Sequence, residues 1–154
     1  MTEQEQALIS LAEHEEAIGG LYQDFADSFP EHAAFWSGCA HEEFRHAAII
    51  RSMQDLAAKG TVRLTGRFNA RAIQTSLAYI GQQTTLARSK QMQARQAFAI
   101  ALSIESSLLE NRYFEMFGAE SPEFQEMQRT ILEETVKHRR MVQAALEKVE
   151  DQPR

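Results

Sequence analysis

The segment AHEEFRHAAII, residues 40–50, places a carboxylate and an imidazole on what is otherwise the apolar face of a helix. Glu43 and His46 continue a series of apolar positions that runs from Trp36 to Ile50. Because residues three apart lie on one face of a helix, the two side chains can reach a single metal ion. An unpaired charge in an apolar core is costly, so this face must contain something that neutralises it.

Three further apolar stripes carry a metal-capable side chain near their middle. Glu15 interrupts the stripe of the first predicted helix, Glu105 that of the fourth and His138 that of the last. A cluster of three or more carboxylates with two histidines is best neutralised by a pair of divalent or trivalent cations. The sequence therefore predicts a buried metal site to which four helices contribute.

An internal repeat relates the two histidine-bearing segments. Shifting the sequence by 92 residues lays HEEFRH over EETVKH. Glu42 then matches Glu134, and the two histidines match each other, but Glu43 matches Thr135. The repeat predicts two related half-sites, one of which lacks a carboxylate, with Glu42 and Glu134 as reserve ligands.

Length and composition exclude several classes of function. The chain has 154 residues, a net charge of −6 and one cysteine. Its basic residues are spread among acidic ones, which excludes a nucleic-acid-binding stripe, and one cysteine excludes a disulfide or a rubredoxin centre. A signal peptide and an apolar run of about 20 residues are both lacking, so we expect a cytoplasmic protein without a membrane partner. One domain over residues 1–150 and a polar tail at 151–154 are expected.

Helix-forming residues and few alternating β-branched runs predict an all-α chain. The expected helices cover residues 3–28, 30–59, 70–80, 89–117 and the chain from 122 onward. The residues that would begin or end them are Thr2, Pro30, Gly60, Gly81, Gly118, Ser121 and Pro122. Two antiparallel hairpins joined by a long crossover with a short helix describe a ferritin-like four-helix bundle.

With these residues in this order, the sequence resembles the ferritin-like diiron superfamily, on the bacterioferritin and rubrerythrin side. Members of that superfamily carry a Glu in helix one, Glu-x-x-His in helix two, a Glu in helix three and a second Glu-x-x-His in helix four. The resemblance covers most of residues 5–148 and departs at Thr135. The metal ligands that it implies are Glu15, Glu43, His46, Glu105 and His138, with Glu134 as the nearest replacement for the missing carboxylate.

The resemblance implies two iron ions, with manganese or zinc as alternatives, in a ferroxidase- or peroxidase-type oxidoreductase. Such a protein oxidises Fe(II) or reduces oxygen or peroxide, and without a rubredoxin centre its electrons come from a separate donor. Tyr22, seven residues after Glu15, matches a spacing of the family and would be a redox neighbour of the metals, although an aromatic residue at this spacing also suits core packing. A homodimer is expected.

A degenerate bundle is the alternative that Thr135 favours. Its site would be mononuclear or empty, and the protein would act as a structural or partner-binding protein. The remaining histidines, His14, His32 and His41, have no inward partner in the pattern and are expected to face solvent.

Overall fold

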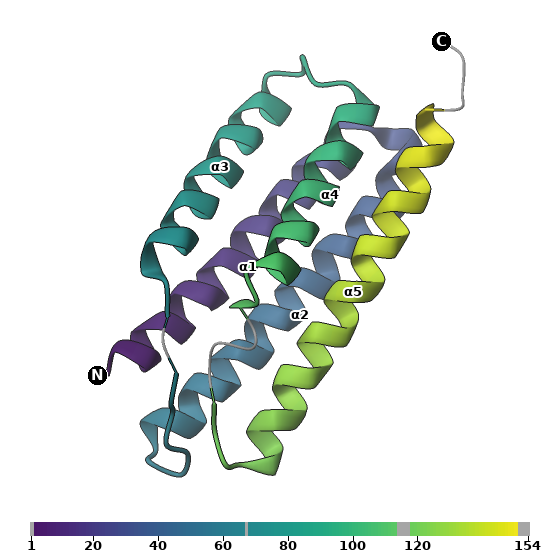
Figure 1. Cartoon of the computed structure of the whole chain (residues 1–154). Helices are drawn as coiled ribbons and strands as arrows, with labels where there is room; N and C mark the ends of the chain where they lie inside the picture. Colours follow the sequence, from purple (N-terminus) through teal and green to yellow (C-terminus); the bar gives the residue numbers. More distant parts are fainter. Residues whose placement is uncertain (1, 67, 114–117, 151–154) are drawn as a thin grey trace.

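The computed structural model describes residues 2–66, 68–113 and 118–150, which form five α-helices (Figure 1). Within these ranges the only β pairing is an isolated bridge between Thr65 and Gly118, so the prediction of an all-α chain is confirmed. No helix in the described ranges combines the length and the apolar character that a membrane crossing requires. The predicted polar tail lies outside the described residues. The elements are α1 (Glu3–Ser28), a 3₁₀ turn (Pro30–His32), α2 (Ala33–Ala58), α3 (Ala70–Arg88), α4 (Ala94–Glu110) and α5 (Pro122–Glu150).

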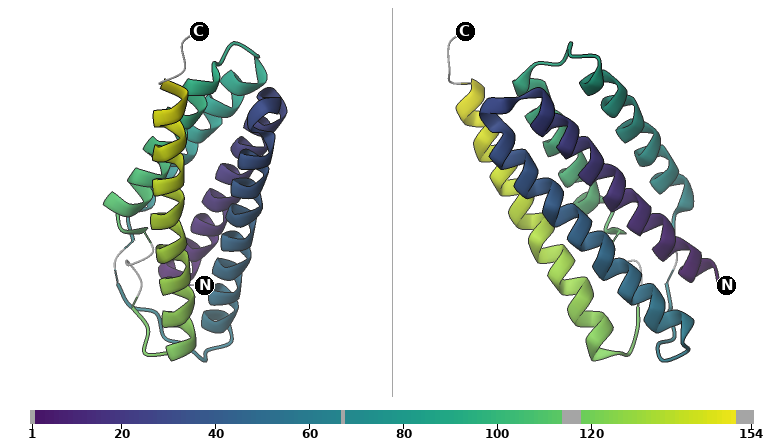
Figure 2. Two further views of the ribbon diagram at one scale, coloured as in Figure 1. Left: turned by 90° about the vertical axis from the view of Figure 1, so that its right-hand side faces the viewer. Right: turned by 180° about the vertical axis from the view of Figure 1, so that it is seen from behind.

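The helices pack as a bundle in which neighbours in the sequence form pairs. α1 packs along α2, α4 packs along α5, and α2 also contacts α5. α3 belongs to the connection between the two pairs and packs on α1, at the side of the bundle (Figure 2). Short connections between long helices favour such pairing, whereas a long connection lets the chain travel the length of a bundle.

Two helices begin at capping residues that the sequence already indicates. At α1, Oγ1 of Thr2 accepts a hydrogen bond from the Glu5 amide at 3.1 Å, and the Thr2 amide donates to Oε2 of Glu5 at 2.6 Å. At α5, the Phe124 amide donates to Oγ of Ser121 at 3.2 Å, and Pro122 is the first helical residue. These caps satisfy amides that have no partner inside the helix. Both predicted starts are confirmed.

α3 is longer than the sequence predicts. An end near Gly81 is expected, but the helix continues to Arg88 and has 19 residues, against 17 in α4. A glycine inside a helix costs only about 1 kcal/mol relative to alanine. The burial of Ile80 and Ala87 in the core favours continuation of the helix across the glycine. The helix ends shortly before Lys90, whose φ of 63° is left-handed.

α4 is shorter than the predicted span of residues 89–117. It stops before Arg112, whose φ of 51° cannot continue a right-handed helix. Gly118 is therefore not its C-terminal cap. The amide and carbonyl of Gly118 instead pair with those of Thr65, both at 2.9 Å. The rest of the predicted extension, residues 114–117, lies outside the described residues.

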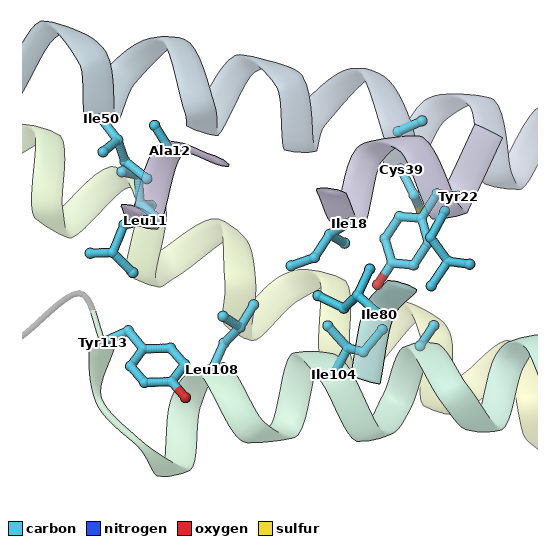
Figure 3. Close-up of a cluster of buried hydrophobic side chains, with 14 of the residues drawn as sticks. Leu11, Ala12, Ile18, Tyr22, Cys39, Ile50, Ile80, Ile104, Leu108 and Tyr113 are labelled. Carbon is cyan, nitrogen blue, oxygen red and sulfur yellow. The ribbon is translucent and has the colours of Figure 1, made fainter. Parts of the chain in front are cut away.

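Apolar side chains form two groups along α1 (Figure 3). One group lies around Leu11, and the other lies around Ile18 and Tyr22, facing Ile80 of α3. Glu15 falls between these groups in the sequence of α1 and is itself 0% exposed. α1 therefore presents a carboxylate to the core between two apolar stretches.

Candidate metal centre

Five buried side chains with metal-binding atoms converge from four helices. Their exposed fractions are at most 1%, and all five are residues that the sequence predicts as ligands. α3 contributes none of them. They are Glu15 of α1, Glu43 and His46 of α2, Glu105 of α4 and His138 of α5.

The five side chains form two half-sites that share one residue. In the first half-site, Glu15, Glu43 and His46 each have a ligand atom within 4.8 Å of the others. In the second half-site, the same holds for Glu43, Glu105 and His138. Each half-site could hold one ion. Glu43 belongs to both half-sites, and its Oε2 lies 3.7 Å from Nδ1 of His46 while its Oε1 lies 3.2 Å from Nδ1 of His138.

Several ligand atoms have no hydrogen-bond partner among the described residues. A buried polar atom left without a partner costs about 1–3 kcal/mol, and such atoms are rare in native structures. Here they gather within the two half-sites, where a cation would satisfy several of them at once. The donor atoms thus fit a metal ion better than they fit one another. The atoms are both carboxylate oxygens of Glu15, Oε2 of Glu43, Nδ1 of His46 and Oε2 of Glu105.

Burial and mutual repulsion set the charges of the three carboxylates. Burial, together with repulsion from Glu43, raises the pKa of Glu15 and that of Glu105 well above the usual value. Burial alone would also raise the pKa of Glu43, but interactions with Glu15, His138 and His46 hold that pKa well below its usual value. Without a metal the cluster therefore favours a charge on Glu43 over a charge on Glu15 or Glu105, which limits the repulsion among buried anions.

The outer nitrogen of each ligand histidine is held by a carboxylate from the opposite helix. Nε2 of His46 in α2 lies 2.5 Å from Oε2 of Glu134 in α5. Nε2 of His138 in α5 pairs in turn with Oε2 of Glu42 in α2. An acceptor at Nε2 favours the ring proton there, which in His46 leaves the Nδ1 lone pair for a metal. Nδ1 of His138 also faces a carboxylate, Oε1 of Glu43 at 3.2 Å, and although burial lowers the pKa of this ring, its contacts with Glu43 and Glu42 raise that pKa above the usual value. The contacts of His46 with Glu134 and of His138 with Glu42, which we call the crosswise pairs, orient both histidines.

The fourth carboxylate of the predicted ligand set has no counterpart in either half-site. Glu134 lies behind His46, where its side chain is 24% exposed and also pairs with Arg45. Thr135 is buried, and its Oγ1 donates a hydrogen bond to the Ile131 carbonyl at 2.8 Å. The hydroxyl is thus engaged with its own helix. α5 therefore supplies an imidazole but no carboxylate to the cluster.

Tyr22 is a direct neighbour of a ligand. Its hydroxyl donates to Oε1 of Glu105 at 3.0 Å, and its ring centroid lies 5.2 Å from that of Trp36. Burial, with repulsion from Glu105 and Glu43, raises the pKa of the phenol well above its usual value, so the hydroxyl remains a donor. Tyr22 is thus a core residue and holds a ligand in place. A redox role for it stays a prediction.

His14 is buried, although the sequence predicts that it faces solvent. It is 1% exposed, its Nε2 lies 2.7 Å from Oγ of Ser76 in α3, and its ring meets Tyr113 edge-on. Burial lowers its pKa to about 4, so the ring is neutral at physiological pH. Its spacing from Leu11 and Ile18 already placed it on the apolar stripe. The prediction was wrong because α3 covers this side of α1.

No protein-family model matches the sequence, and neither a curated protein nor a solved structure is significantly similar to the chain. Both half-sites offer only carboxylate oxygens and imidazole nitrogens. Such donors suit iron, manganese and zinc. The chain thus contains a buried carboxylate–histidine cluster that could bind metal ions.

Proposed function

We propose that this chain is a ferritin-like bundle whose cluster holds two iron ions and oxidises Fe(II) or reduces oxygen or peroxide. The observation that carries the proposal is the convergence of unpartnered oxygen and nitrogen atoms in two half-sites that share Glu43. Manganese and zinc are the alternative ions for this donor set.

The packing of the helices supports the ferritin-like assignment. The pairs α1–α2 and α4–α5 supply all five ligands, and α3 lies in the connection between the pairs. A four-helix bundle with one long crossover, and with inward Glu and His side chains, is the arrangement of ferritin-like metal proteins.

Bound iron would supply the redox chemistry, because Fe(II) gives up electrons to oxygen or peroxide. The residues of the chain have separate tasks in this proposal. Glu43 bridges the two half-sites, while Tyr22 holds one oxygen of Glu105 and leaves Oε2 free. The crosswise pairs orient the two histidines. Because Thr135 offers no carboxylate, His138 is the residue of α5 that would hold an ion.

Metal analysis of protein purified without chelators tests the proposal. After anaerobic loading with Fe(II) we expect about two iron ions per chain and oxidation that depends on added oxygen. Glu15→Gln should lower the loading, because it removes a ligand charge from the first half-site. Glu13→Gln is the matched control, since Glu13 is exposed on the same helix. Loading below about a tenth of an ion per chain would contradict the proposal.

A second candidate function rests on Thr135. In this alternative the cluster is mononuclear or empty, and the bundle serves as a structural or partner-binding protein. One ion per chain without oxygen-dependent oxidation would favour it. The variant Thr135→Glu would then separate the two functions, because an added carboxylate at this buried position should raise the loading only if the missing ligand limits it.

A further inference from the structure

A cavity of about 540 Å³ lies between α3 and α4. Its walls come from these two helices and from residues next to them, and none of the five ligands of the metal centre lines it. Binding sites for small organic molecules usually have volumes of roughly 300–1,000 Å³. This cavity is open to solvent and offers enough space for a small organic molecule that does not occupy the metal centre.

The charge of the cavity favours an anion. Arg71 is the only charged residue among the described residues that line it. It lies in the first turn of α3, which contains no acidic residue. The positive end of the α3 dipole therefore adds to the charge of the guanidinium. A guanidinium binds a carboxylate or a phosphate through two parallel hydrogen bonds, so an oxyanion suits this wall, and a carboxylate is the smaller of the two.

The rest of the lining suits a ring. Ile104 and Tyr113 are each 2% exposed and form the closed floor of the cavity, while the half-buried Tyr79 and Ala72 offer accessible apolar surface. The hydroxyls of Ser76 and Ser107 lie among these apolar groups and can donate or accept hydrogen bonds. Aromatic and aliphatic walls pack well against the face and edge of an aromatic ring.

Residues of the cavity wall touch a neighbour of the metal centre. Ser76 bonds to His14, and Tyr113 packs against the same ring. His14 directly precedes the ligand Glu15 in α1. A molecule in the cavity therefore lies against side chains that contact His14, with a single imidazole between this wall and the ligand-bearing face of α1.

We propose that this cavity binds a small aromatic carboxylate, with Arg71 on the carboxylate and Tyr79 against the ring. No redox step is required for such binding. The proposal goes beyond the function proposed for the metal centre and does not depend on whether that centre loads.

Benzoate is the probe, and calorimetric titration of the full-length chain, both as purified and metal-free, is the measurement. We expect a Kd of about 1 mM or below in both samples. Benzyl alcohol and benzylamine keep the ring without the negative charge, and acetate keeps the charge without the ring. Each should bind at least about tenfold more weakly than benzoate.

Two results of this titration would overturn the proposal. One is no binding of benzoate to metal-free protein up to about 20 mM, or binding only to the sample that contains metal. The other is equal affinity for benzyl alcohol and benzoate, because the cavity would then not recognise the carboxylate.

Variants locate the binding within the molecule. Arg71→Gln should weaken benzoate binding at least about tenfold. Arg140→Gln is its matched control, because it removes one positive charge from an exposed position on α5. Ser107→Phe should fill the cavity and abolish binding. Unchanged helical circular dichroism and an unchanged unfolding midpoint establish that each variant is folded. If folded Arg71→Gln protein binds benzoate with wild-type affinity, the proposal is wrong, whatever the result for Ser107→Phe.

Discussion

The two half-sites of the metal centre share one carboxylate but differ in how their other ligands are held. In the second half-site, Tyr22 donates to Glu105 at 3.0 Å, and Nδ1 of His138 lies 3.2 Å from Oε1 of the shared carboxylate. In the first half-site, both oxygens of Glu15 and Nδ1 of His46 have no partner among the described residues. Although Oε2 of Glu105 and Oε2 of Glu43 also have no partner among those residues, the second half-site thus has more hydrogen bonds from the protein than the first.

The difference between the half-sites implies that an unpartnered ligand affects stability and metal binding in opposite directions. A buried carboxylate without partners destabilises the metal-free fold, and a cation that binds it removes that cost. We therefore expect Glu15 to lower the stability of the metal-free protein and to act as a ligand when a metal is bound. Glu105 should keep its hydrogen bond from Tyr22 in both states.

The largest expected effect comes from the ligand that the half-sites share. Glu43→Ala removes a carboxylate from both groups, so the variant should retain neither ion. Glu15→Ala and Glu105→Ala should each spare the other half-site and retain one ion. The ions per chain after loading measure this difference. If Glu43→Ala keeps one tightly bound ion, the half-sites do not share a ligand.

The next largest difference between the half-sites should appear in the stability of the metal-free protein. Glu15→Met replaces a carboxylate that lacks partners by an apolar side chain of similar size, so the free energy of unfolding should rise by about 1–3 kcal/mol. Glu105→Met also loses the hydrogen bond from Tyr22 and should give a smaller gain or a loss. Urea unfolding measures both variants. A destabilised Glu15→Met protein would show that this carboxylate is satisfied without a metal.

Each crosswise pair should affect the metal affinity of only one half-site. Glu134→Ala removes the acceptor behind His46, and Glu42→Ala removes the acceptor behind His138. Loss of such a partner typically lowers metal affinity about 10–100-fold. Competition with a chelator measures the two affinities, and Glu133→Ala, at an exposed position on α5, is the control. Equal weakening of both half-sites by either variant would mean that the pairs do not act separately.

Metal affinity should increase with pH. Burial raises the pKa of both Glu15 and Glu105, so a metal must displace their protons, and each displaced proton raises the apparent affinity up to about tenfold per pH unit. Titration of the chain with Mn(II) at several pH values measures this slope. An affinity that does not change with pH would show that these carboxylates are already ionised.

The stability of the metal-free fold should follow pH in the opposite direction. The folded chain holds the protons of Glu15 and Glu105 more tightly than the unfolded chain does, so the free energy of unfolding falls as pH rises above the usual 4.5. His14, whose pKa falls from 6.5 to about 4, opposes this trend only below pH 6.5. Melting temperatures of metal-free protein above that pH should therefore decline, and bound Mn(II) should reduce the decline.

The smallest expected effect concerns Tyr22. Tyr22→Phe removes one hydrogen bond to Glu105, so the second half-site should lose about 0.5–1.5 kcal/mol of metal affinity while the first stays unchanged. Tyr79→Phe is the control, because Tyr79 lies in α3 outside the cluster. Slower iron oxidation at full loading in Tyr22→Phe would support the redox role, whereas unchanged loading and unchanged oxidation would assign Tyr22 to packing.

The burial of the candidate ligands could be predicted because it follows from local periodicity. Glu15, Glu105 and His138 each take a place in an apolar stripe, and the helical period alone brings such residues to the core side. The spacing of Glu43 and His46 fixes them on one face in the same way. No knowledge of the packing between helices is needed for these assignments.

The partners outside the cluster could not be predicted in this way. The crosswise pairs depend on how α2 and α5 are aligned along their length, and the sequence of neither helix contains that alignment. Glu134 was therefore expected to bind a metal, whereas its carboxylate lies behind His46. The burial of His14 depends on the length and position of α3. The sequence predicts too short a helix here, because Gly81 suggests an end that α3 does not have.

The placement of α3 has a consequence for the motions of the protein. α3 packs mainly on α1 and carries no ligand, so its displacement breaks no bond within either half-site. Segments with fewer stabilising contacts open locally at a lower free energy than global unfolding requires. Amide hydrogens of α3 should therefore exchange with solvent faster than those of α1 and α2.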